Sequence, residues 1–436
     1  MITPIMLSVV IVGLAVFMRL GAGTWLHPAA FFSGWWMLAA IMPMIVAPQE
    51  PVSAGAVAWV IAACLAVSAG AVAGNGGLVT RRVMSDAGVS RFEASLVSWP
   101  MLIALGLGML SNIAFAMSSG VSASDLLDIQ RLVVVSNQAY AARYAETGAP
   151  PPPRLVQAML PFVYLAPALG GIVFVARREL RWKLAAMATM APAVAVTVLQ
   201  TTKAAVLFGG TLWLCSYFAM RLRFGKLKVV TRGHLLTAAV LGALVTVFFV
   251  AVGFARLAST DASLIGLVRL KLITAAFGHM GVFSSWLNDY WTQPFGPTLG
   301  AYTFAGPLEL MGIKQRVPGV FENVVELIAG ETSNIYTGFR PLIEDFGMPA
   351  SLAILGALGV IGGWAYRAVS FGRWGALPAL IAAYMTMLWT PITWFWIYNS
   401  LTATVIAVGF LVFFIRLWRR SRPRVITGGR IVRTIQ

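Results

Sequence analysis

The dominant pattern along the chain is a series of long apolar runs separated by short polar stretches. A helix needs about 20 mainly apolar residues to cross the hydrocarbon core of a bilayer, and eleven runs approach that length. The runs lie near residues 3–18, 29–47, 53–73, 95–117, 155–176, 184–199, 204–220, 235–254, 348–366, 375–391 and 399–415. We therefore predict an all-α polytopic membrane protein with about eleven transmembrane helices, or twelve if residues 255–285 contain a further span.

The composition supports this class and excludes others. Of the 436 residues, 59% are hydrophobic and 11% are charged, which is far from the average usage of soluble domains. The net charge of +17 could indicate a nucleic-acid partner, but no soluble domain offers a basic face to phosphates. Cys64 and Cys215 lie within apolar runs, so we expect packing residues rather than disulfide or metal ligands. The first run lacks the basic start and cleavage site of a signal peptide and is expected to be retained as a span.

The charges between the runs predict the sidedness of the chain. Lysine and arginine concentrate in one set of alternate loops and in the C-terminal tail, whereas most acids fall in the other set. The positive-inside rule then places the basic set in the cytoplasm and the tail against anionic lipid headgroups. Two long segments, 118–154 and 255–347, lie outside. We treat residues 1–436 as a single membrane domain that carries these two outward loops.

The most specific polar stretch is SNIYTGFRPLIEDFG at residues 333–347, directly before an apolar run. Arg340 and Glu344 are four apart and would form an ion pair on one helix face. Pro341 suits the first position of a helix, which would place Glu344 and Asp345 in the first turn, where the macrodipole stabilises acids. Capping therefore explains both carboxylates but not Arg340. It also leaves unexplained the polar residues Asn334, Tyr336 and Thr337.

Other outward bases are candidates for binding an anion. Arg269 and Lys271 interrupt a helix-like apolar spacing, so they either snorkel from an interfacial helix or face a cavity. Arg256 lies nearby in the same segment. Lys203 stands between two apolar runs at the outer face, where it either reaches lipid headgroups or is aimed at phosphate. Aromatic residues around Trp286 fit the ordinary membrane belt or a surface that stacks on sugar rings.

Candidate acids and bases are few. His27 and His234 fall on the inner side, so His279 is the outward histidine, and a structural role is favoured for it over that of a base. No charged residue falls inside the eleven runs, which disfavours an ion-coupled transporter. The outward loops show no metal-ligand spacing, so we expect neither a metal site nor a cofactor.

These motifs resemble the Wzy-type oligosaccharide repeat-unit polymerases of O-antigen and exopolysaccharide synthesis. In that family an Asn-x-Tyr-Thr-x-Phe run leads to Asp-Phe-Gly at the outer end of a span. The matching residues here are Asn334, Tyr336, Thr337, Phe339, Asp345, Phe346 and Gly347. The stretch TTKAAVL around Lys203 is similar to a family site where a base opens a span. The resemblance covers residues 200–350, and an outward N-terminus with eleven spans departs from the family's even, N-inside arrangement.

The resemblance implies a multi-span, GT-C-like glycosyltransferase of the bacterial inner membrane with a periplasmic site. It would transfer a growing glycan from undecaprenyl pyrophosphate to the next lipid-linked repeat unit, by inverting single displacement and without a metal. Its partners would be lipid-linked oligosaccharides, membrane lipids, a chain-length regulator and a flippase, and no nucleic acid. The alternatives are an O-antigen ligase that uses the same donor, and a non-enzymatic flippase or transporter of lipid-linked oligosaccharides.

The expected roles of the candidate residues follow from this chemistry. Arg340 would bind the donor pyrophosphate, because guanidinium offers forked donors and keeps its charge. Glu344 and Asp345 are the leading candidates for the general base, followed by His279. The further substrate-binding residues would be Lys203, Asn334, Tyr336, Thr337, Arg256, Arg269 and Lys271.

Overall fold

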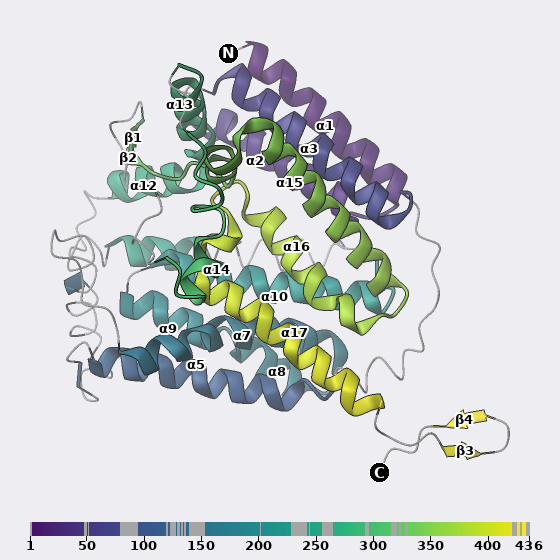
Figure 1. The fold of residues 1–436 in the computed structure, drawn as a ribbon. Coiled ribbons are helices and arrows are strands. Elements are labelled where there is room, and N and C mark those ends of the chain that lie inside the picture. The colour runs from purple at the N-terminus through teal and green to yellow at the C-terminus, as the bar shows by residue number, and fades with distance from the viewer. Residues whose placement is uncertain are drawn as a thin grey trace.

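The computed structural model describes residues 2–47, 52–78, 95–118, 153–200, 202–227, 245–254, 265–292, 296–314 and 332–420, with shorter pieces that include 321 and 324–327. Within these residues, nine helices are long and apolar enough to cross a membrane, and a bent helix pair makes a tenth if it counts as one span. The chain is therefore an all-α polytopic membrane protein, as predicted from the apolar runs (Figure 1).

The described residues form long apolar helices and several shorter ones. They are α1 (Ile2–Ala22), α2 (Pro28–Val46), α3 (Ala54–Asn75), α5 (Ser98–Ser118), α7 (Arg154–Ala176), α8 (Leu180–Ala188), α9 (Ala191–Gln200), α10 (Lys203–Arg223), α12 (Ile265–Phe277), α13 (His279–Thr292), α14 (Ala305–Leu310), α15 (Phe339–Ser370), α16 (Leu377–Trp389) and α17 (Asn399–Arg420). The 3-10 turns η3 (Trp374–Ala376) and η4 (Phe395–Ile397) flank α16. Two short antiparallel pairs join β1 (Val325–Glu326) to β2 (Thr332–Ser333) and β3 (Val425–Thr427) to β4 (Arg430–Val432).

Most predicted spans correspond to one helix each, and the exceptions are informative. α8 and α9 together form one span, Leu180–Gln200. The run at 375–391 is realised as a shorter apolar helix, Trp374–Trp389, and the run at 235–254 is described as a helix only over Val245–Phe254. The segment proposed for a twelfth span contains α12 and α13, which are bent by 59° at their junction and form a broken span or a re-entrant loop.

The helices pack as two groups joined by α16 (Figure 1). α1, α2, α3 and α15 pack against one another and share one hydrophobic core, whereas α5, α7, α10 and α17 share a second core. α16 contacts α2 and α15 on one side and α10 and α17 on the other. The start of α15 therefore lies where the first group meets α13 and the loops around α14.

α3 and α15 approach each other through glycines. A Cβ atom on Gly70 or Gly74 would overlap backbone atoms of α15, and one on Gly359 or Gly363 would overlap backbone atoms of α3. Small residues four apart allow helices to pack closely in membranes, where dispersion contacts replace the hydrophobic effect between helices. The two helices run parallel, because Gly70 meets residue 356 and Gly74 meets Val360. This packing fixes the helix that carries the candidate site.

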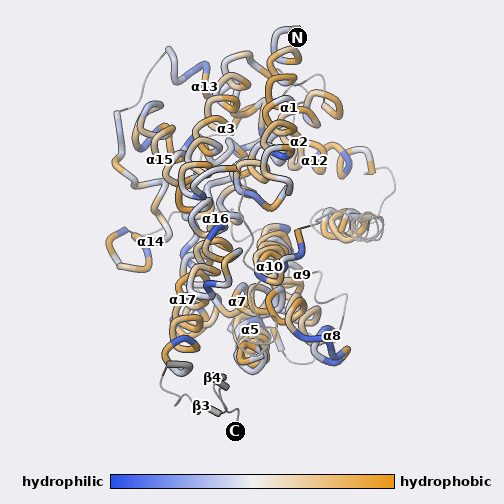
Figure 2. Tube along the Cα trace, turned by 90° about the vertical axis from the view of Figure 1, so that its right-hand side faces the viewer, coloured by the Kyte–Doolittle hydropathy of each residue, from blue (hydrophilic) through white to orange (hydrophobic). Residues whose placement is uncertain are grey.

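The loop ends assigned to the same compartment lie together in the structure. Arg223 donates to the carbonyl of Gly372 at the end of α15, and its guanidinium lies 5.3 Å from the Trp374 ring. Thr24, in the first basic loop, donates to the carbonyl of Leu227 at 2.9 Å. α12, α13 and the β1–β2 pair gather at the opposite end of the helices (Figure 1), and the helices between the two ends are mainly apolar (Figure 2). The predicted grouping of loops is thus present, while the compartment of each group stays a prediction.

Candidate functional site

The first residues of α15 are fixed by contacts with the segment after α16. The N–H of Gly338, the N-cap residue, donates to the carbonyl of Thr390 at 2.6 Å, and a Cβ at Gly338 would lie 3.0 Å from the backbone of Thr393. Phe339 is fully buried and stacks on Trp36 with ring centroids 4.8 Å apart. The position and direction of the helix start are therefore determined by tertiary packing.

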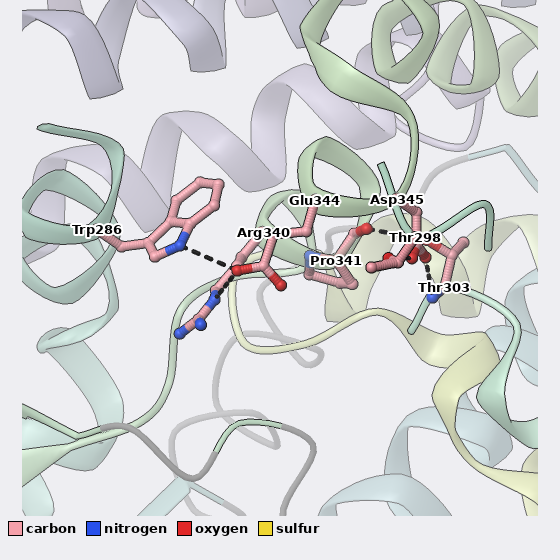
Figure 3. A network of polar contacts seen from close by, with 7 residues as sticks. All are labelled: Trp286, Thr298, Thr303, Arg340, Pro341, Glu344 and Asp345. Atoms are coloured by element: carbon pink, nitrogen blue, oxygen red, sulfur yellow. Dashed lines mark hydrogen bonds and ion pairs between the residues drawn. The ribbon is translucent and has the colours of Figure 1, made fainter. Parts of the chain in front are cut away.

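The helix begins two residues earlier than the sequence predicted. We expected Pro341 at the first position and Glu344 and Asp345 in the first turn, but α15 begins at Phe339 and has no acid in its first turn. The capping explanation of the two carboxylates is therefore wrong. Each carboxylate instead takes part in a separate side-chain network, one on either side of the first two turns of α15 (Figure 3).

The first network is a buried ion pair. Arg340 Nε donates to Glu344 Oε1 at 2.9 Å, and the two side chains are only 7% and 8% exposed. The same oxygen accepts a hydrogen bond of 3.2 Å from the indole Nε1 of Trp286 on α13 (Figure 3). The predicted pair is therefore confirmed. Because it is buried, removing either partner would leave an uncompensated buried charge and would strongly destabilise the fold.

Aromatic rings enclose the guanidinium of Arg340. Its Cζ atom lies 3.8 Å from the ring centroid of Phe321 and 3.9 Å from that of Tyr336, with the Trp286 ring at 5.6 Å. Cation–π contacts of this kind are strongest where water is excluded. Burial raises the pKa of the Tyr336 phenol above its ordinary value, so this hydroxyl stays protonated near neutral pH.

One nitrogen of the Arg340 guanidinium lacks a hydrogen-bond partner among the described residues. Nη1 is buried and has no hydrogen-bond partner among the residues that the structure describes. Guanidinium presents five N–H donors in a rigid fork, and phosphate or carboxylate oxygens match that fork. The site can therefore accept an anion at Arg340 if the anion competes with the Glu344 carboxylate for the guanidinium or displaces the ring of Phe321 or Tyr336.

The second network fastens a loop to α15. Asp345 is fully buried and accepts hydrogen bonds from the Thr298 hydroxyl and from the N–H groups of Tyr302 and Thr303, the last at 2.5 Å. Thr303 in turn donates its hydroxyl to the carbonyl of Pro341 at 3.2 Å. With its oxygens occupied in this way, Asp345 is an anchor for the 298–303 loop, and the geometry favours Glu344 over it as a base.

Sequence reasoning missed two residues of this region, Phe321 and Lys314. Lys314 Nζ donates to the carbonyl of Ala301 at 3.2 Å and lies 5.1 Å from the ring centroid of Tyr302. The Tyr302 ring packs against Phe321 at 5.4 Å, so Lys314 and Arg340 border one row of rings. No periodicity or motif marks either residue, because both lie in irregular segments whose contacts are made by the tertiary fold.

The remaining predicted residues of the 333–347 stretch and of α13 lie near this group. Asn334 is exposed, and its side-chain amide donates to the carbonyl of Phe321 at 3.3 Å. Thr337 is buried with a positive φ of 68°, and its hydroxyl accepts from the Phe339 N–H. His279 is buried at the start of α13, where Nε2 lies 2.9 Å from the carbonyl of Ala39, which agrees with the structural role favoured for it.

The other predicted bases lie in different surroundings. Arg269 and Lys271 are exposed on α12, whose buried residues include Val268, so the interfacial-helix interpretation describes them better than the cavity interpretation. Lys203 begins α10, in the other helix group, with its ammonium 5.8 Å from the ring of Phe249. Arg256 and most of the 118–154 segment lie outside the described residues.

No cluster of three or more His, Cys, Asp or Glu side chains that could hold a metal occurs in the described part of the chain. Comparison with family models, with curated proteins and with solved structures found no match for this chain. Of the motif residues, Phe339 and Asp345 are buried in the first two turns of α15, and Tyr336 and Thr337 are buried just before it.

Proposed function

We propose that this protein is a membrane glycosyltransferase that polymerises lipid-linked oligosaccharide repeat units at the periplasmic face of a bacterial inner membrane. The observation that supports this best is the environment of Arg340. A guanidinium held between two rings, at the end of a membrane helix and with a buried Nη1 that has no partner among the described residues, suits a lipid pyrophosphate. The donor would be a growing glycan on undecaprenyl pyrophosphate, and the acceptor the next lipid-linked repeat unit.

In this proposal Arg340 stabilises the leaving group. The bond between the anomeric carbon and the pyrophosphate oxygen breaks, and the negative charge that develops on pyrophosphate is met by the guanidinium. A preorganised contact of this kind typically lowers the barrier by a few kcal/mol, or about 10²–10³-fold in rate. Because the Glu344 carboxylate accepts a hydrogen bond from Arg340 at 2.9 Å, donor phosphate has to compete with this carboxylate.

The same competition would make Glu344 available as the base. Once pyrophosphate binds Arg340, the Glu344 carboxylate retains, among its contacts with described residues, the Trp286 hydrogen bond. It can then take the proton of the acceptor hydroxyl as that oxygen forms the new glycosidic bond. General-base catalysis contributes about 10²–10⁴-fold, and a single displacement of this type inverts the anomeric centre.

The test is complementation of a deletion strain, with profiling of surface polysaccharide and of lipid-linked intermediates. We expect Arg340→Ala to abolish polymer and to accumulate single lipid-linked repeats. Because this variant leaves Glu344 buried without its partner, membrane abundance is measured alongside, and Arg340→Lys, which keeps a positive charge, should lose polymer at normal abundance. Arg269→Ala, which removes an exposed base on α12, is the matched control and should retain polymer. Normal polymer from Arg340→Ala would overturn the proposal.

The same experiment separates the two rival functions. A ligase would accumulate long lipid-linked polymer in the deletion strain, because its donor is the finished chain. A flippase makes no bond, so the purified protein supplied with two lipid-linked repeats would yield no longer product. Formation of a dimeric repeat by the wild type, and its loss in Arg340→Lys, would support forked recognition of phosphate by the guanidinium.

A further inference from the structure

A second cluster of bases and rings lies at the opposite end of the helices from Arg340. Lys183 on α8 lies 5.8 Å from the ring centroid of Phe174, and Arg221 on α10 lies 5.5 Å from that of Tyr217. Arg221 Nη1 also donates to the Tyr217 hydroxyl at 2.8 Å. The Phe174 and Tyr217 rings are 6.1 Å apart, and both contact Trp213, so the two cations border one continuous aromatic surface.

Lys183 also belongs to an exposed apolar face. Leu180, Leu184 and Met187 share its side of α8 at helical spacing and are 69%, 61% and 45% exposed. α8 is the first half of the span Leu180–Gln200 and lies at the edge of the molecule (Figure 2). In a bilayer these three side chains would face acyl chains, and Lys183 would lie in the first turn of the span, near the membrane surface.

Among the described residues, the charges that border this surface are mainly positive. Glu179 is the acid next to it, and its carboxylate lies 3.7 Å from Arg177, which also covers the Trp182 ring at 5.1 Å. Lys183 has no carboxylate within ion-pair distance among the described residues. Bases between membrane helices beside aromatic rings bind the phosphates of anionic lipids, whose chains cover the adjoining apolar face.

We propose that the surface formed by Lys183, Arg221 and the rings of Phe174, Trp213 and Tyr217 is a binding site for an anionic phospholipid. The phosphate lies between the two cations, and the acyl chains lie along Leu184 and Met187. A soluble acidic partner would not suit the exposed leucines, which need hydrocarbon rather than water. This proposal is independent of the proposed function.

The test is lipid binding to the full-length protein in nanodiscs of zwitterionic lipid doped with cardiolipin. We expect cardiolipin to raise the thermal stability of the wild type by mass action, and Lys183→Ala to weaken its apparent affinity about fivefold, as for loss of one base at the membrane surface. Lys183→Arg should restore binding. The double variant Lys183→Ala/Arg221→Leu should remove the stabilisation.

Arg178→Ala is the matched control, because it removes one exposed base from the turn before α8 without touching the aromatic surface. It should retain the cardiolipin response. An unchanged response in Lys183→Ala would overturn the proposal, as would an equal loss in Arg178→Ala, which would indicate general surface charge. The proposal would also be overturned if replacing the added cardiolipin by further zwitterionic lipid stabilised the wild type equally.

Discussion

At the scale of single residues, Glu344 has two roles that experiment can separate. Its carboxylate accepts from both Arg340 and Trp286, so it holds the guanidinium and would also act as the base. Removing its negative charge affects the two roles in opposite directions. Competition with substrate phosphate disappears, whereas proton transfer is lost.

We therefore expect Glu344→Gln to bind inorganic pyrophosphate more tightly than the wild type, while polymerisation falls by about 10²–10⁴-fold. Titration of purified protein with pyrophosphate gives the first quantity, and turnover of two lipid-linked repeats gives the second. Glu326→Gln, at an exposed position of β1, is the control and should change neither. Parallel loss of binding and turnover would leave Glu344 only as a structural partner of Arg340.

The residues of the site differ in how far the sequence could predict them. The spacing of Arg340 and Glu344 predicts their ion pair, because positions four apart share a helix face. Trp286 could not be placed in this way, since it is 58 residues from Glu344 in the chain. Asp345 carries the same kind of side chain as Glu344, yet only the fold shows that it fastens the 298–303 loop.

At the scale of elements, the pairing of α3 with α15 determines whether the site can form. The sequence analysis did not single out the glycines at 70, 74, 359 and 363, because a pair of glycines four apart does not identify its partner helix. The helix start shows the same limit. Pro341 suggested a local rule for the first turn, whereas contacts of Gly338 and Phe339 with the segment after α16 decide where α15 begins.

Gly359→Ala tests this packing. The new Cβ would overlap the backbone of Val67, so α3 and α15 must separate, and overpacking of this kind destabilises by about 1–3 kcal/mol. We expect lower thermal stability and reduced polymerisation, measured on purified protein and in complemented cells. Gly409→Ala on α17 is the control, because nothing lies within 4 Å of its Cβ position. Equal stability of the two variants would contradict the close approach.

At the scale of the whole molecule, apolar length and loop charge predicted most of the architecture. The runs were recognised because a helix that crosses lipid satisfies its own backbone hydrogen bonds and needs about 20 mainly apolar residues. The described part of segment 255–347 was less predictable, since α12 and α13 are apolar but bent by 59°, and no local pattern distinguishes such a pair from an interfacial helix. Several loops that the charge asymmetry assigned to one side do lie together, because Arg223, Arg367 and Thr24 are all at one end of the helices.

Sidedness can be tested by labelling, because the native thiols of Cys64 and Cys215 are fully buried. Asn334→Cys introduces an exposed thiol beside Arg340, and Arg181→Cys introduces one at the opposite end, before the cationic cluster. With a membrane-impermeant maleimide we expect intact spheroplasts to label Asn334→Cys alone, and lysed membranes to label both. Since a lipid-linked donor and acceptor must meet where Arg340 is, the reverse pattern would place the site in the cytoplasm and remove the basis for polymerisation at the periplasmic face.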